Sequence, residues 1–463
     1  MVRRMRVFRS IASALLAGAL TTACGGFTPT PAPTIAPSNR GRPMPSGTGV
    51  FVAPSQAPTP VSSPAATGVA PTPSGVLPAL DLPTLSVPAA SLHTMPGNGG
   101  LVTWGSHVYA VDEPLRSGHA SIVVTDLVTG TAFRTTIPLL AGETTVPPDG
   151  FADPATTVAV DDHWLVVVVW KRLGSTGGEV STPCTGHEEQ PLAWRVLVAR
   201  VDPSSGRIVG GFRVLDRGVS SHRFTLPGQG EGCGGPRTPR VSLSGDQIAY
   251  TVEESDATAP FATRVEIRTL PSGLLRRSVE RPDEVLFVKL SGGTLAFTET
   301  QDASTVTNPR WSVEWSTVVD QAPTVVVAGR QDPGYVAPPD IALDGNLLSW
   351  QLLRQRGSGL WVESLGSSPV QVVPARLTCW LGGVTDGWVV MGCYPTGYQA
   401  SGVTPYQPVV WSAATGLRQL AGVPRVVASS PPAVGAGWLS IDGGTDIQPN
   451  GTLYGLSLHD LAP

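Results

Sequence analysis

Short apolar runs alternate with tight turn sequences along residues 79–463, and one pattern occurs seven times. In each instance a two-residue turn precedes a β-favouring run such as Ile248-Ala249-Tyr250 or Leu295-Ala296-Phe297. Asp-Gly and Gly-Gly supply the positive φ angles that two-residue hairpin turns need. The pattern therefore predicts repeated hairpins. The turn sequences are Gly105-Ser106-His107-Val108, Asp162-His163-Trp164-Leu165, Gly245-Asp246-Gln247-Ile248, Gly292-Gly293-Thr294-Leu295, Asp344-Gly345-Asn346-Leu347, Asp386-Gly387-Trp388-Val389 and Ala436-Gly437-Trp438-Leu439.

A third strand and a second turn follow most of these hairpins. Ile122–Leu127 leads into Val128-Thr129-Gly130, for example, so each unit has four short strands. Successive units are spaced by about 42 to 83 residues, and a period of about 40–50 residues with four strands per unit is the signature of propeller blades. The sequence predicts an all-β fold, a single β-propeller of four-stranded blades over residues 79–463. Seven blades are expected, with six or eight as alternatives because the long second interval leaves room for an extra blade.

The repeated units resemble a known group of proteins. A turn followed by a Leu-Ala-aromatic strand, and then a strand ending in Thr-Gly or Ser-Gly, is similar to the TolB-like and WD-repeat-like β-propellers of bacterial envelope proteins. The resemblance implies an architecture and no particular function, and the Trp-Asp dipeptide is absent. The alternative folds are a pair of β-sandwiches or a solenoid, and the irregular spacing argues against a solenoid, whose units stack more uniformly.

The first 23 residues predict a lipoprotein signal peptide. Arg3, Arg4, Arg6 and Arg9 precede an apolar stretch that is shorter than the roughly 20 residues a bilayer requires. Leu20-Thr21-Thr22-Ala23-Cys24 resembles a bacterial lipobox, although that family usually has Leu at the position of Thr21. The resemblance implies that Cys24 carries lipid and anchors the protein to the membrane, outside the cytoplasm. The alternative is ordinary cleavage and free secretion.

Residues 24–78 predict a disordered tether. They consist mainly of Pro, Thr, Ser, Ala and Gly, and such a composition offers too little apolar surface to offset the entropy of ordering. Pro-rich chains extend by about 3.1 Å per residue, so the tether would span on the order of 150 Å. We expect no transmembrane helix after the signal peptide, because no later apolar run is long enough.

Charge and motifs narrow the function classes. The net charge is −4 and no basic patch is evident, so a nucleic-acid partner is not expected. The sequence contains no Gly-x-Ser-x-Gly elbow and no complete dinucleotide, Walker or zinc-protease motif. We therefore expect no cofactor and no catalytic residues. Asp162, Asp344 and Asp386 are expected to stabilise their own turns rather than bind a cation.

Four cysteines remain after Cys24, an even number in an exported chain. Cys379 and Cys393 flank the sixth turn on two hairpin-linked strands, and Cys184 and Cys233 lie in two Gly-rich excursions of the second interval. These positions predict the disulfides Cys379–Cys393 and Cys184–Cys233. Cys184 with His187 also resembles half of a metal site, but a second ligand pair is missing, so no metal is expected.

The two excursions, Gly174–Gln190 and Gly218–Arg240, are the predicted ligand-binding surface, because loops on a rigid scaffold usually carry binding residues. The leading hypothesis is a non-catalytic binding or scaffold module for an envelope protein, peptide or glycan. The alternative is a propeller enzyme of the lyase, lactonase or glycosidase type that acts at the central channel. The candidate binding residues are Glu179, His187, Glu188, Glu189, His222, Arg223, Glu231 and Arg237.

The chain ends before a seventh unit would complete its outermost strand. An open edge there would be an aggregation hazard. The apolar stretch Leu80–Val87 precedes the first unit and has no other partner in the repeat. The sequence therefore predicts that Leu80–Val87 pairs with the seventh unit and closes the ring.

Overall fold

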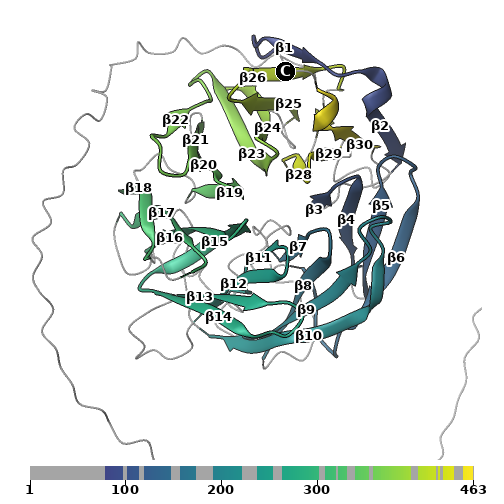
Figure 1. The fold of residues 1–463 in the computed structure, drawn as a ribbon, viewed down its shortest axis with the longest axis vertical. Helices are drawn as coiled ribbons and strands as arrows, with labels where there is room; N and C mark the ends of the chain where they lie inside the picture. The colour runs from purple at the N-terminus through teal and green to yellow at the C-terminus, as the bar shows by residue number, and fades with distance from the viewer. Residues whose placement is uncertain are drawn as a thin grey trace, which may run out of the picture. The chain divides into compact units, whose positions relative to one another are not determined.

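The computed structural model describes residues 79–96, 102–113, 119–146, 157–173, 191–221, 237–253, 263–301, 308–319, 322–330, 339–353, 358–397, 405–423, 426–427, 431–442 and 452–461. The chain divides into two units, Met1–Val69 and Ala70–Pro463, and the described residues all belong to the second. Their strands form seven sheets around a common axis, antiparallel except for one N-terminal strand of blade six (Figure 1). The fold is a seven-bladed β-propeller with four-stranded blades, as predicted.

The blades follow the chain order. Blade one contains β3 (Val102–Trp104), β4 (His107–Asp112), β5 (Ala120–Asp126) and β6 (Ala132–Ile137). Blade two contains β7 (Val158–Val160), β8 (Trp164–Arg172), β9 (Leu192–Val201) and β10 (Ile208–Ser220). Blade three contains β11 (Val241–Ser244), β12 (Gln247–Glu253), β13 (Thr263–Thr269) and β14 (Leu275–Arg281). Blade four contains β15 (Glu284–Ser291), β16 (Thr294–Thr300), β17 (Arg310–Thr317) and β18 (Thr324–Arg330).

The last three blades complete the ring, and β28 contacts β3 of blade one. Blade five contains β19 (Asp340–Asp344), β20 (Leu347–Leu353), β21 (Ser358–Ser364) and β22 (Val370–Gln371). Blade six contains β23 (Leu377–Thr385), β24 (Trp388–Pro395), β25 (Pro405–Ser412) and β26 (Gly416–Ala421), with β27 (Val426–Val427) beside β25 and β1 (Thr84–Ser86) beside β26. Blade seven contains β28 (Ala433–Gly435), β29 (Trp438–Asp442), β30 (Thr452–Ser457) and β2 (Leu92–Pro96).

Helix is scarce in the described residues. It is limited to the short 3₁₀ turns η1 (Ala89–Ser91) and η3 (Leu458–Asp460). Within the described ranges, no helix has the length and apolar character that crossing a bilayer would require.

The core lies between the blades, which explains why some strands are apolar without interruption. In β8, Val166, Val168 and Trp170 pack in a cluster shared with blade three. The alternate residues Leu165, Val167 and Val169 pack in a cluster shared with blade one. Because successive side chains of a strand point to opposite faces, a strand sandwiched between two blades must be apolar at both parities.

The N-terminal segment closes the ring, but not with the predicted residues. β2 pairs antiparallel with β30 and supplies the outermost strand of blade seven, whereas β1 pairs in parallel with β26 of blade six. Leu80 is buried in the cluster of blade six. The predicted pairing of Leu80–Val87 with blade seven is therefore wrong. An outermost strand needs fewer apolar residues than a central one. The sequence of Leu92–Pro96 therefore did not indicate that this segment forms a strand.

The two faces of the ring carry different connections. Turns that join the first to the second strand, and the third to the fourth, lie on one face, here called the turn face. Connections between the second and third strands, and between blades, lie on the opposite face, here called the loop face. The turn face is regular: in blades one to five the N–H of the second turn donates to a carbonyl of the first, as from Leu127 to Ser106 or Leu365 to Asn346.

The long second interval holds no additional blade in its described part. The 13-residue strand β10, with bulges, and the connections 173–191 and 221–240 account for its length. The second excursion is also shorter than predicted. Gly218, Val219 and Ser220 belong to β10 and pair with β9, and Gly218 lies against the ring of Trp194, which leaves no room for a Cβ atom.

Candidate functional site

Both predicted excursions leave from one place on the loop face. Arg172 at the end of β8 and Ser220 at the end of β10 both pair with Leu192 at the start of β9. The ends of the two connections are therefore adjacent in one sheet, in agreement with their assignment to a common face. Of the eight candidate binding residues, only Arg237 is described. The other seven, together with Cys24, Cys184 and Cys233, lie outside the described residues.

Arg237 lies at the base of the second connection, beside the buried carboxyl of Glu253. The Arg237 backbone N–H donates to Glu253 Oε1 at 2.8 Å, and both residues are buried. Burial raises the pKa of Glu253 well above its usual range, and repulsion from Glu284 adds to the rise. The charge and N–H of Arg237 oppose the rise and do not cancel it. Glu253 is thus held toward its neutral form, in which it has an O–H to donate.

Glu284 is the other buried acid of this group. It begins β15, and the hydroxyl of Thr263, which begins β13, donates to it at 3.1 Å. Glu253 ends β12, so all three residues lie at strand ends on the loop face. We call Arg237, Glu253, Thr263 and Glu284 the loop-face cluster.

A second charged group lies next to this cluster, between blades three and four. Arg281 donates to Glu299 at 2.5 and 3.0 Å and to Glu314 at 2.8 Å. The Asp283 N–H donates to the other Glu299 oxygen at 3.1 Å. Burial raises the pKa of Glu314, and burial with repulsion from Glu299 raises that of Asp283. Two carboxylates thus share one guanidinium. The carboxyl groups outnumber the guanidinium groups in this part of the loop face, and the pKa values of Glu314 and Asp283 are raised.

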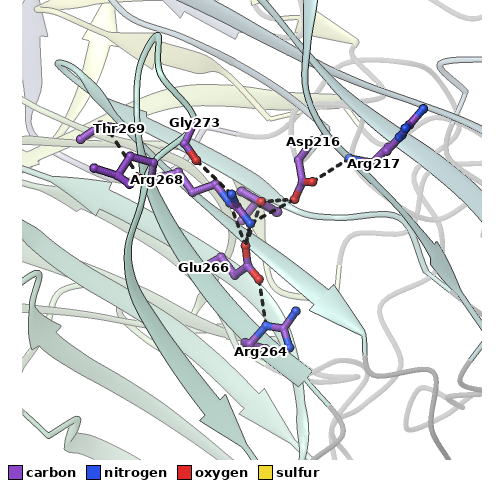
Figure 2. A network of polar contacts seen from close by, with 9 residues as sticks. Asp216, Arg217, Arg264, Glu266, Arg268, Thr269 and Gly273 are labelled. Carbon is purple, nitrogen blue, oxygen red and sulfur yellow. Dashed lines mark hydrogen bonds and ion pairs between the residues drawn. The ribbon is translucent and has the colours of Figure 1, made fainter. Parts of the chain in front are cut away.

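A third polar network joins blades two and three (Figure 2). Glu266 accepts hydrogen bonds from Arg264 at 2.9 Å and from Arg268 at 2.6 and 2.9 Å. The Tyr250 hydroxyl lies within hydrogen-bond distance of both Glu266 and Asp216. One hydroxyl proton serves two carboxylates, and burial and the neighbouring carboxylates raise the pKa of Tyr250, so the phenol stays protonated. This network fixes β10, and with it the end from which the second connection leaves.

The described cysteines form the predicted disulfide. Cys379 and Cys393 face each other across β23 and β24, with Cα atoms 4.1 Å apart, and both are fully buried. They lie near the loop-face ends of their strands. The bond therefore clamps blade six on the side where its connection 396–404 begins.

The turn aspartates have roles that differ in detail from those predicted. Asp344 accepts the N–H of Asp386 at 2.7 Å, so it stabilises the turn of the next blade rather than its own. Asp162 forms an ion pair with His163 at 2.7 Å. No group of three or more metal-ligating side chains occurs within the described ranges.

Sequence reasoning missed Glu253, Glu284 and the network of Figure 2. Glutamate at a strand end reads as a solvated loop residue, and Glu253 is followed by Glu254 in the sequence. Only the docking of one blade on the next buries these carboxyls. For Glu253 the sequence offers one indication of burial: Thr251-Val252-Glu253 continues an apolar strand without a turn residue.

Comparison with known proteins bears on the fold alone. No protein-family model matches the sequence, and no curated protein matches it. The β-propeller domain of the Trilobed protease from Pyrococcus furiosus is 9% identical with a TM-score of 0.45, over 80% of this chain and 96% of that one. TolB from Acinetobacter baumannii is 10% identical with a TM-score of 0.35, over 78% and 85%. An oligogalacturonate lyase in complex with manganese is 12% identical with a TM-score of 0.37, over 78% and 85%.

Proposed function

We propose that this chain is an exported lipoprotein whose propeller binds a polar envelope partner, a protein, peptide or glycan, through its loop face. The observation that carries the proposal is the difference between the faces. Turns of two to a few residues leave little surface for recognition, whereas the connections 173–191 and 221–240 begin side by side on the loop face. The buried loop-face cluster holds Arg237, near the end of the second connection, and rigid support of recognition loops favours specific binding.

The loop face is tested by cross-linking and affinity measurement. One variant replaces residues 174–190 and 222–236 with Gly-Ser turns, and a matched control replaces residues 128–130 and 414–415 on the turn face. We expect partners identified by cross-linking mass spectrometry to bind the intact protein and the control equally, and the loop variant at least about tenfold more weakly. Equal affinity for a folded loop variant would place recognition elsewhere.

The anchor is tested separately. The Arg-rich start, the short apolar stretch and the Ala23-Cys24 junction support lipidation, and multiple acyl chains give stable anchoring where one gives marginal binding. We expect mass spectrometry to find a lipidated Cys24 at the mature N-terminus and a Cys24→Ser variant to leave the membrane fraction. An unmodified N-terminus beyond residue 24 would contradict the anchor while leaving the binding face untouched.

A second candidate function has one observation in its favour. Glu253, held toward its neutral form, lies near Glu284, and a protonated carboxyl beside a second carboxyl suits acid–base chemistry of the glycosidase or lyase type. Both side chains are nearly buried, at 6% and 2% exposed, which opposes direct substrate contact. Turnover of p-nitrophenyl glycosides or polygalacturonate that Glu253→Gln abolishes would favour the enzyme over the binding module.

A further inference from the structure

A chain of hydrogen bonds links successive blades on the turn face. In blades three to six, the side chain just before the first turn accepts the N–H of the next blade's turn. Ser244 accepts from Gly292 at 3.1 Å and Ser291 from Gly345 at 2.8 Å. The same link runs from Asp344 to Asp386 at 2.7 Å and from Thr385 to Gly437 at 2.8 Å. Between blades seven and one the carbonyl of Gly435 takes this role toward Gly105.

Blades one and two depart from this pattern, since the Asp161 side chain of blade two accepts from its own turn. In blade one the residue before the turn is Trp104, which has no acceptor atom to offer. Among the described residues, no such link joins its side chain to the turn of blade two. A pocket of about 160 Å³ lies there instead, between the turns of blades one and two. Its volume is similar to that of an engineered cavity of about 150 Å³ that holds benzene.

Asp161 supplies the unused hydrogen-bonding capacity in this pocket. It occupies the position before the turn in blade two and is 1% exposed. Its Oδ1 accepts the N–H groups of His163 at 2.9 Å and Trp164 at 2.7 Å. Its Oδ2 is buried and has no partner among the described residues. Burial raises the pKa of Asp161 to about 6, which leaves it mainly ionised at neutral pH. A buried carboxylate oxygen without a donor is costly, so the arrangement favours a ligand that donates.

The lining of the pocket favours a cation. Asp161, Asp162 and Asp202 contribute carboxyl groups, and no Lys or Arg is among the lining residues. Burial lowers the pKa of His107 against the opposing charge of Asp126, so this imidazole is neutral at pH 7. The Tyr109 hydroxyl donates to the carbonyl of Gly206 at 3.0 Å, which leaves its oxygen free to accept.

The remaining wall is apolar. Trp104 lines the pocket and packs against the apolar cluster of blades one and two, and an indole face attracts an organic cation. The φ angle of Gly206 is +64°, and it packs directly against the ring of His107, which leaves no space for a side chain that would fill the site. The pocket thus combines hydrogen-bond acceptors, negative charge, an aromatic wall and a small volume. These features suit a small organic cation.

We propose that the pocket between the turns of blades one and two binds a primary alkylammonium group, with the Asp161 carboxylate as the main acceptor and Trp104 as the apolar wall. Two sources present this group: a free small amine, and the side chain of a lysine in a peptide. The site lies on the turn face, so it is separate from the binding face proposed above.

The test uses n-butylammonium, which matches a lysine side chain in length, and 1-butanol as its neutral counterpart. Ligand-observed NMR titration of the folded protein should give a dissociation constant on the order of 1 mM for the cation and no saturable binding of the alcohol. Asp161→Asn keeps the turn acceptor and removes the charge, and we expect at least about a tenfold loss of affinity. The matched control Asp344→Asn changes the equivalent residue of blade five and should leave affinity unchanged.

Trp104→Ser introduces the residue that blades three and four have at this position, and it should weaken binding as well. If near-ultraviolet circular dichroism shows that Asp161→Asn does not fold, Trp104→Ser becomes the variant that tests the proposal. Equal binding of cation and alcohol, undiminished binding by either folded variant, or no saturable binding by the wild type would overturn the proposal. Tighter binding of Nα-acetyl-lysine-N-methylamide than of n-butylammonium would identify a peptide lysine as the source, and equal binding a free amine.

Discussion

Blades six and seven are joined by backbone pairing and apolar packing, whereas blades two, three and four combine apolar packing with buried ion pairs. On the first side β1 and β2 add N-terminal strands, and Leu85 and Val87 pack with Leu420 and Leu456 in one cluster. On the second side Arg268 pairs with Asp216 of blade two at 3.6 Å. Arg281 of blade three pairs with Glu299 of blade four at 2.5 Å. Apolar contacts lack a titrating group, so the two sides of the ring should respond differently to pH.

This difference between the two sides shows why one propeller uses both strand pairing and buried ion pairs to join its blades. Closing a ring requires segments far apart in the sequence to meet, and backbone pairing with apolar burial stabilises that junction at any pH. Neighbouring blades meet without such a demand, so charged residues are tolerated between them and specify how the blades dock. These ion pairs make the stability depend on pH. When a carboxylate is protonated, its buried partner ion is left unpaired, and this is strongly destabilising.

Removing the closing strand should have the largest effect. A chain that starts at residue 98 lacks β1 and β2 and exposes Leu453 and Leu456, which are 1% exposed in the closed ring. We expect it to lose about 3 kcal/mol or more of unfolding free energy, since burying one aliphatic side chain contributes about 1.5–3 kcal/mol. A chain that starts at residue 88 lacks only β1 and should lose less, and a start at residue 76 should change little. Thermal unfolding that does not follow this order would contradict closure by β2.

Removing the disulfide should have the next largest effect. The Cys379→Ala, Cys393→Ala variant opens a loop with a sequence separation of 14, and a loop of that size corresponds to about 3 kcal/mol in the chain-entropy treatment. We expect a loss of about 2–3 kcal/mol in urea unfolding that is the same at pH 5 and pH 8. A loss that varies strongly between these pH values would show that charges also hold this side of the ring.

The charged side is tested by Tyr250→Phe. The variant removes the hydroxyl that lies between Asp216 and Glu266 and keeps the ring packed. The carboxylates keep Arg268, so we expect a loss of about 1–2 kcal/mol, typical of a hydrogen bond to a charged group. The matched control Tyr394→Phe alters a tyrosine of blade six and should change the unfolding free energy by less. Equal losses at the two positions would remove the contrast between the sides.

Glu253→Gln should have the smallest effect at pH 5 and a growing one above it. The folded pKa of Glu253 is raised, so its contribution is fully present below the ordinary glutamate pKa and is lost as the pH rises through the folded value. The variant cannot ionise, and we expect it to gain stability relative to the wild type as the pH rises from 5 to 8. Parallel curves of unfolding free energy against pH for the two proteins would show that folding does not raise the pKa of Glu253.

The repeat could be predicted because its signals are local. Turns such as Asp386-Gly387 and Gly292-Gly293 need positive φ angles, and the structure has them there. The strands that follow alternate or are apolar throughout, and Cys379 lies opposite Cys393 once the hairpin is placed. Trp104 also carried a local signal, because the residue before the turn is Ser244 and Ser291 in the corresponding blades, and only comparison of the units with one another reveals the exception.

The sequence by itself determined the repeated strands and turns and the disulfide of blade six, because each depends on residues close together in the chain. It favoured seven blades and left six or eight open, and the structure decided for seven. Tertiary structure alone decided that β2 rather than β1 completes blade seven, that Glu253 and Glu284 share a buried site, and that a pocket forms beside Trp104. Pairing of an outer strand depends on which edge is open when the ring closes. Likewise, the pKa of a carboxyl and the size of a pocket depend on what the next blade places against them, and that placement is a property of the assembled ring.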